Sequence, residues 1–389
     1  MDVLQQGTLA LVKAAITGQP CPLPEGFQID QAVDMIRRHK ITGLAYEGAV
    51  KCGIDKQCST MKEMFQHYYG DIIRHERQMQ VLKSLENAFQ ENGIDYLPLK
   101  GTILKPLFPQ PAARVMGDAD ILIRMEQYDK IKPIMVALGF QEGNVTRHEL
   151  HWNHPGLHLE LHKMLMSERN MDYHRYYGDD WARAIPCDRY RYTFRTEDHF
   201  IHLFVHYAKH YRAGGIGLRQ LIDLWVYQRT YSNMDMEYIG SELLLLKLQD
   251  FFANTQKMLK VWFEDDTLDD KSAFMSDYIC SGGCWATREN LLLFEKLKDE
   301  HLAGSRRKLD MQHFFQTVFP PVKYLKNRYP VLEKAPFMLP VFWPVRWITA
   351  LLFRRNNIKS TQENREATSA KKADIYLAQL QYVGLDFDF

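Results

Sequence analysis

The chain has 389 residues, of which 46% are hydrophobic, 12% aromatic and 25% charged. This composition is that of an ordinary globular protein, and it sets aside the disordered, collagen-like and membrane-spanning classes. Forty-nine Lys and Arg face 48 Asp and Glu, a formal net charge of +1. The near-neutral charge argues against a protein that coats long nucleic acid, because phosphate-backbone binding favours a strong basic excess.

The six cysteines are spread over the chain without a CxxC pair, and no basic stretch followed by an apolar run opens the sequence. We therefore expect neither a disulfide framework nor a secretory signal, and a cytoplasmic location. The apolar run over 335–355 is interrupted by Pro336, Pro340 and Pro344. It falls short of the ~20 apolar residues of a membrane span, so we expect no transmembrane segment, with weak membrane or protein contact through 335–355 left open.

Helical periodicity fills the first ninety residues. Apolar groups from Leu9 to Ile16 and from Val33 to Leu44 predict two segments. A longer pattern from Met61 to Gln90 predicts a helix that begins near Ser59 and is stopped by Asn92-Gly93. Residues 1–92 are therefore predicted to form an N-terminal helical region.

Short β-like runs follow, separated by helical stretches at 101–107 and 125–138. The runs are Ile94 to Leu99, Ala119 to Ile123 and Leu157 to Leu161. This alternation predicts a small α/β core over 93–165. Helical segments are predicted again at 199–211, 218–229, 241–263 and 287–302, and a solvated loop and helix start at 359–372. The predicted fold class is α+β, with a small mixed sheet flanked by the N-terminal region and a mainly helical region over 166–389.

Asp118 and Asp120 stand at the start of the second β-like run, within Gly-Asp-Ala-Asp. Side chains alternate along a strand, so both carboxylates point to the same side. They repel one another, and a hard divalent cation would keep both ionised. The pair is therefore a candidate metal site, and a simple turn after Gly117 is the alternative.

Two neighbouring motifs can complete such a site. Lys100-Gly101-Thr102 lies where a strand ends and a helix begins, so that free backbone N–H groups and the helix dipole can receive a phosphate; a plain turn is the alternative. Downstream, the run from His158 to His162 alternates polar and apolar residues, which places Glu160 on the same face as both histidines. For Glu160 the alternative is a solvated strand face.

The order of these motifs resembles the polymerase-beta-like nucleotidyltransferase superfamily. That pattern is a Gly followed by a small residue at a helix start, an Asp-x-Asp strand, and a third carboxylate on a neighbouring strand. More narrowly, Leu99-Lys100-Gly101, Arg114 and the Gly-Asp-Ala-Asp run at 117–120 are similar to a bacterial family of uncharacterised nucleotidyltransferases. A looser match continues through His206, Lys209 and His210 to Arg219 and 221–224.

The resemblance implies a Mg²⁺-dependent enzyme that moves a nucleoside monophosphate from an NTP to an acceptor hydroxyl and releases pyrophosphate. Asp118, Asp120 and Glu160 would be catalytic and would hold two Mg²⁺ ions, because phosphoryl transfer depends mainly on alignment and charge neutralisation. Further implied roles are nucleotide binding by Lys100, Gly101, Thr102, Arg114 and Gly117, and a possible substrate cleft at His206, Lys209 and His210. Two residues depart from the pattern, since Thr102 replaces a Gly or Ser and Glu160 an Asp. The acceptor is unknown, and the near-neutral charge favours a small molecule over long nucleic acid.

Two other functions stay open. A catalytically inactive nucleotide-binding or scaffold module predicts that Glu160 points away from Asp118 and Asp120. A zinc-dependent hydrolase would use the histidine cluster from His148 to His162, whose spacing differs from the His-Glu-x-x-His pattern. Asp223 is expected to pair with Arg219 or with a histidine.

Overall fold

The computed structural model describes residues 1–283, 288–303, 319–320, 322–325, 329, 331–345 and 370–385. The chain divides into two compact units. The first consists of Met1–Ala286 with Gln381–Asp388, and the second of Thr287–Leu380 with Phe389. The three regions expected at 1–92, 93–165 and 166–389 stay a prediction. Everything that bears on the candidate site lies in the first unit.

Helices α1 (Val3–Thr17), α2 (Ile29–Arg38), α3 (Thr42–Lys51) and α4 (Ser59–Glu91) precede the sheet. The long helix α4 confirms the expectation from Met61 to Gln90. α2 and α3 replace the single segment expected from Val33 to Leu44, because the backbone turns at Lys40 with φ 53°. α1 and α3 pack closely, since a Cβ on Gly48 would lie 1.8 Å from the Leu11 carbonyl oxygen.

The sheet has seven strands in the described chain, in the order β3-β4-β5-β2-β1-β7-β6. The strands are β1 (Tyr96–Leu99), β2 (Ala119–Ile123), β3 (Gln141–Val145), β4 (Glu149–His154), β5 (Leu157–His162), β6 (Ala184–Asp188) and β7 (Arg191–Phe194). β2 pairs antiparallel with β1 and parallel with β5, so the sheet is mixed. This confirms the predicted α+β class.

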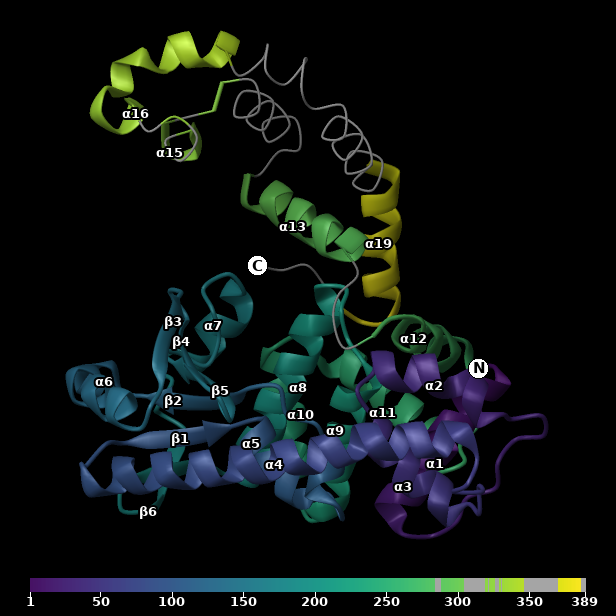
Figure 1. Ribbon diagram of the computed structural model, residues 1–389. Coiled ribbons are helices and arrows are strands. Elements are labelled where there is room, and N and C mark those ends of the chain that lie inside the picture. Colours follow the sequence, from purple (N-terminus) through teal and green to yellow (C-terminus); the bar gives the residue numbers. More distant parts are fainter. Residues whose placement is uncertain are drawn as a thin grey trace. The chain divides into compact units, whose positions relative to one another are not determined.

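Alternation along β2 and β5 gives the sheet two different faces. The odd-numbered residues of both strands are apolar and buried, and they join α4 and α6 (Tyr128–Ala137) in one core. This core includes Leu82, Leu85, Phe89, Ile121, Ile123, Ile131, Met135, Trp152, Leu159 and Leu161. The even-numbered Asp120, Glu160 and His162 point to the opposite side, which we call the site face. Figure 1 shows α4 running from α3 along the sheet.

Short segments connect the central strands: α5 (Gly101–Leu104), η1 (Lys105–Leu107), η2 (Pro111–Ala113) and η3 (Met125–Gln127). The rest of the first unit is helical: α7 (Met171–Tyr177), α8 (Thr196–Arg212), α9 (Leu218–Thr230), α10 (Met236–Leu245), α11 (Gln249–Phe263) and α12 (Asp270–Ser281). α8 and α9 confirm the helices expected at 199–211 and 218–229. The helix expected at 241–263 is wrong as a single element, because the backbone turns at Lys247 with φ 55° between α10 and α11.

The second unit contains α13 (Arg288–Ala303), α15 (Val322–Leu325), α16 (Val331–Lys334), η4 (Pro336–Met338) and most of α19 (Ala370–Tyr382). The structure describes 335–345 of the Pro- and Trp-rich segment, and residues 346–355 and 359–369 lie outside the described residues. None of the helices among the described residues is long and apolar enough to cross a membrane. Contact of 335–355 with a membrane or a protein stays a prediction.

Candidate active site

A cavity of about 340 Å³ lies between the site face of the sheet and the helices α8 and α9. It is lined by most of the residues that the sequence singled out: Lys100, Gly101, Arg114, Gly117, Asp118, Asp120, Glu160, His206, Lys209 and His210. Other polar lining residues are His148, Glu149, His162, Ser167, Arg219, Gln220 and Asp223. The fold therefore brings the strand motifs and the helical motifs to one cavity.

The carboxylates of the site come from two adjacent parallel strands. Asp120 on β2 is the direct register partner of Glu160 on β5, so their side chains lie next to each other on the site face. One oxygen of each, with a ring nitrogen of His162, falls within a group whose atoms all lie within 4.8 Å of one another. Asp118 immediately precedes β2, two residues from Asp120, and lines the same cavity.

Asp120 is buried and has two basic partners. The Lys100 ammonium donates to its Oδ1 at 2.7 Å, and His162 donates to the same oxygen through Nε2 at 2.8 Å. Burial opposes ionisation of Asp120, but Lys100 and His162 outweigh it and hold the pKa of this carboxyl well below its usual range. Asp120 is therefore a permanent anion, and its Oδ2 takes part in neither of these bonds.

The pKa of Glu160 shifts in the opposite direction. Burial, together with the negative charges of Asp120, Asp118 and Glu149, raises the pKa of Glu160 to about 8. The charge of Lys100 opposes this rise in the pKa of Glu160 but does not cancel it. The orientation differs from that predicted for the scaffold alternative, since Glu160 faces Asp120 rather than pointing away.

The strand-to-helix turn after β1 places Lys100 in an unusual conformation. Lys100 has φ 45°, a left-handed region that non-glycine residues rarely adopt, and it precedes the single turn of α5. Position 101 requires a glycine, because a Cβ there would lie 2.9 Å from the Arg114 guanidinium and 3.0 Å from the Met116 side chain. The Thr102 hydroxyl donates to the Leu99 carbonyl at 2.7 Å, and Thr102 is not among the residues that line the cavity.

Three side chains from different elements fix the loop that leads into Asp118. Lys105 donates to the carbonyl of Arg114 at 2.8 Å, Arg219 to that of Val115 at 3.1 Å, and Gln78 to that of Met116 at 2.9 Å. These bonds satisfy three successive carbonyls that would otherwise be unpaired in the interior. The loop is thereby held from η1, α9 and α4 at once. Gly117, which follows it, has open space around the position of a Cβ.

Arg114 is the structural link between the sheet and α9. Its guanidinium forms a bidentate pair with Asp223, with bonds of 3.0 and 2.7 Å, and both side chains are buried. The expectation that Asp223 pairs with Arg219 or a histidine is wrong, because Arg219 turns instead to the backbone before Asp118. Planar two-point pairing of this kind favours arginine over lysine.

The helices α8 and α9 form the side of the cavity that faces the sheet, and this helical wall carries basic groups. His206 and His210 lie one turn apart on α8, with their Nε2 atoms 3.1 Å apart. Burial, with the nearby charge of Lys100, holds the pKa of both imidazoles well below the usual range. Burial and the same Lys100 charge lower the pKa of Lys209 to about 8. His202, the third histidine of this stripe, is buried in the protein.

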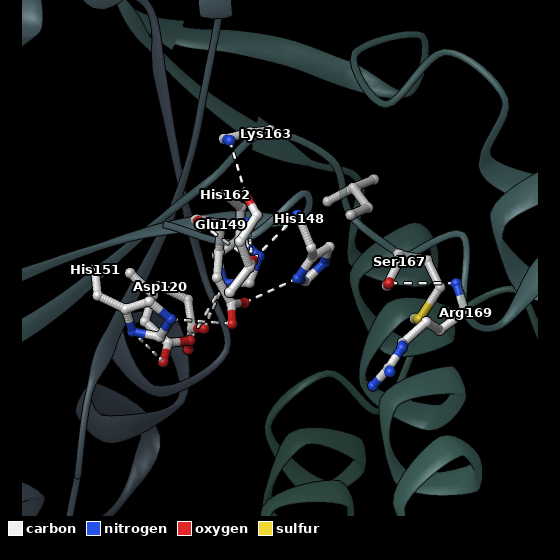
Figure 2. Close-up of polar contacts among 12 residues, drawn as sticks. Asp120, His148, Glu149, His151, His162, Lys163, Ser167 and Arg169 are labelled. Atoms are coloured by element: carbon white, nitrogen blue, oxygen red, sulfur yellow. Dashed lines mark hydrogen bonds and ion pairs between the residues drawn. The ribbon is translucent and has the colours of Figure 1, made fainter. Parts of the chain in front are cut away.

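The histidine cluster of β4 and β5 lies beside the carboxylates. His148 Nδ1 is 2.8 Å from Glu149 Oε2, and this bond, with the charges of His148, His162 and His151, lowers the pKa of Glu149 to about 2 although burial opposes it. Figure 2 shows Glu149 and His162 between His148 on one side and Asp120 with His151 on the other. Sequence reasoning missed Glu149 as part of the site, although its place in the histidine-rich run is a signal.

Comparison with known proteins agrees with the strand motifs. Residues 25–264 match the model of a family described as uncharacterised nucleotidyltransferase. The match spans more than half of the chain, including the sheet, α8 and α9, and the chain belongs to this family. Comparisons with curated proteins and with solved structures find no match. The family membership supports a transferase, and the individual roles of the site residues are taken up below.

Proposed function

We propose that the protein transfers a nucleoside monophosphate from an NTP to an acceptor hydroxyl and releases pyrophosphate, with Mg²⁺ bound by Asp118, Asp120 and Glu160. The observation that carries this proposal is the pairing of Asp120 with Glu160 across two adjacent strands, in a cavity that also holds Asp118. Family membership gives the reaction class. The inactive scaffold has less support, because Glu160 lies beside Asp120 and lines the same cavity as Asp118.

The donor set suits Mg²⁺. All three side chains offer carboxylate oxygens, which this ion prefers, and Glu160 has a raised pKa because negative charge accumulates around it. When bound, the metal would neutralise phosphate charge and favour the attacking form of the acceptor hydroxyl. Lys100 and His162 fix the orientation of Asp120 by binding its Oδ1. Its other oxygen, Oδ2, is then the one that would bind the metal.

We assign the phosphates to basic groups of the cavity. Lys209 and Arg219 line the cavity from α8 and α9, and Lys100 lines it from the sheet side. An NTP carries its negative charge on the triphosphate, so it gains most where cations meet it inside an enclosed site. The cavity, at about 340 Å³, falls in the usual range for small-molecule sites, as binding of an NTP requires. The near-neutral net charge of +1 favours a small acceptor over long nucleic acid.

Thermal unfolding with each of the four NTPs, with and without Mg²⁺, tests the proposal. A ligand at ~100 times its dissociation constant adds about 2.7 kcal/mol to the folded state, which raises Tm by several degrees. We expect a Mg²⁺-dependent rise for the donor NTP, and we expect the Asp118→Asn/Asp120→Asn double variant to lose it. Pyrophosphate release with that NTP should be lost in the same variant.

Asp129→Asn is the matched control, because Asp129 is an exposed carboxylate on α6, on the other face of the sheet. It should keep the full shift. If no NTP raises Tm, or if the double variant keeps the rise, the proposed site is wrong. Far-UV circular dichroism of each variant shows whether the fold is retained.

A further inference from the structure

Next to the carboxylates, two imidazoles and one carboxylate oxygen converge on the face of β4 and β5 that carries Glu160. His151 on β4 is the direct register partner of Glu160 on β5, and His158 lies two residues before Glu160 on the same strand face. His151 Nδ1 lies 3.3 Å from His158 Nε2 and 3.4 Å from Glu160 Oε1, and His158 Nε2 lies 3.9 Å from the same oxygen. The three side chains are partly exposed, so solvent reaches them.

The other nitrogen of each imidazole lies near an oxygen acceptor. His158 Nδ1 lies 2.8 Å from the Asn153 side-chain oxygen, which can only accept. His151 Nε2 lies 3.3 Å from Glu149 Oε1, also an acceptor. The two nitrogens that face each other share a hydrogen bond, so one of them donates, and a metal ion that binds both would displace that proton.

The spacing of these three ligand atoms suits a metal ion, because all lie within 4.8 Å of one another. In a tetrahedral site with Zn–N bonds of about 2.0–2.1 Å, neighbouring ligand atoms are about 3.3 Å apart. The nitrogen–nitrogen and the shorter nitrogen–oxygen separations match that edge. Metal-binding histidines commonly place their second N–H against a carboxylate or carbonyl, and here His158 Nδ1 lies 2.8 Å from the Asn153 oxygen and His151 Nε2 3.3 Å from Glu149 Oε1.

We propose that His151, His158 and Glu160 form a transition-metal site for an ion of the Zn²⁺ class, which lies next to the Mg²⁺ site of the proposed function and shares Glu160 with it. Two imidazoles and one carboxylate favour such an ion over Mg²⁺, which prefers oxygen ligands. A solvent molecule would complete four-coordination. Glu160 borders both sites, since its Oε1 faces the two histidines and its Oε2 lies 3.8 Å from His162, the partner of Asp120.

Cobalt substitution tests this site without any reference to nucleotides. The untagged full chain, freed of metal, is titrated with Co²⁺ in excess Mg²⁺, so that sites built of oxygen alone are occupied. We expect one bound Co²⁺ with the strong visible absorption of tetrahedral coordination, displaced by Zn²⁺. His151→Ala and His158→Ala should weaken binding by more than the about 10–100-fold typical of outer-shell changes, and Asn153→Leu should fall within that range.

His154→Gln is the matched control. His154 lies on β4 but on the opposite face, against Phe140, and its replacement should leave the Co²⁺ affinity unchanged. Absence of the tetrahedral absorption in the wild-type protein would overturn the proposal. Unchanged affinity in both histidine variants would also overturn it, because the bound Co²⁺ would then lie elsewhere. Neither result depends on whether the protein binds an NTP.

Discussion

The two walls of the cavity are built in different ways. The sheet wall holds Asp118, Asp120 and Glu160 on two neighbouring strands, where strand alternation and register alone bring them together. The helical wall holds His206, Lys209 and Arg219 on α8 and α9, which reach the sheet only through the tertiary fold.

The charges of the two walls differ as well. The carboxylates Asp118, Asp120 and Glu160 come from the sheet side together with Lys100, whereas Lys209 and Arg219 come from the helical side. This division suits a ligand that has both a cation and a polyanion, as a metal–triphosphate complex does. Because the two walls are held by different contacts, substitutions in each wall should change stability and ligand binding in different ways.

The Arg114–Asp223 pair joins the two walls, and breaking it should have the largest effect on stability. Asp223→Ala leaves the Arg114 guanidinium buried without its partner. Removing one member of a buried pair costs about 3–5 kcal/mol. We expect denaturant unfolding to show a loss of this size.

The double variant Arg114→Met/Asp223→Leu provides the control for this prediction. Because it removes both charges, it should recover most of the stability lost by Asp223→Ala. Equal losses in the single and double variants would mean that packing, and not the unpaired charge, sets the cost. A single variant as stable as the wild type would contradict the structural link.

The helical wall also depends on His39, which ties the N-terminal helices to it. His39 is buried, accepts from the Leu218 N–H through Nδ1, and lies 3.2 Å from the Cys280 carbonyl through Nε2. Burial lowers the pKa of His39 to about 4. The unfolded chain, with a histidine pKa near 6.5, binds more protons between these values.

The contribution of His39 to the free energy of unfolding should therefore be fully present above about pH 6.5 and should fall by up to about 3 kcal/mol as the pH drops toward 4. Unfolding free energies at pH 7, 6 and 5 measure this slope. The slope should be shallower in His39→Gln. His199, whose pKa burial also lowers to about 4, contributes equally to both proteins. Parallel slopes in the two proteins would refute this role for His39.

Much of the sheet wall could be predicted from the sequence because its signals are local. The run Ala119–Ile123 is a strand as expected, and period-two alternation puts Glu160 on the polar face of β5. The register that sets Glu160 beside Asp120 was not predictable, since alternation gives the face of a residue and not its partner. The bonds from Lys100 and His162 to Asp120 depend on that register.

Contacts and turns outside the sheet wall were harder to predict, for physical reasons. Arg114 and Asp223 are 109 residues apart, and no periodicity links them. The turn between α10 and α11 uses Lys247 at positive φ, where a glycine would have given a signal. β6 is mostly exposed and lacks apolar alternation, so neither it nor its partner β7 was expected.

The smallest predicted effect concerns the phosphate contacts of the helical wall. Lys209→Gln should weaken NTP binding by about tenfold, the equivalent of one charged hydrogen bond, with the sheet wall intact. Isothermal titration with the donor NTP and Mg²⁺ measures this change. Lys163→Gln is the matched control, because Lys163 bonds the Thr146 carbonyl and is not among the cavity residues (Figure 2). Equal affinities for the two variants would remove Lys209 from the site.

The most direct test of the central claim compares the two glutamates of the cavity. Glu160 is proposed to bind the metal, whereas Glu149, which lines the same cavity, is held by His148 and His151. Electron paramagnetic resonance measures Mn²⁺ binding in the presence of an α,β-methylene NTP analogue, which cannot be cleaved. Glu160→Gln should weaken Mn²⁺ binding by about tenfold or more, and Glu149→Gln should leave it near the wild-type value. Wild-type affinity in Glu160→Gln would contradict the account.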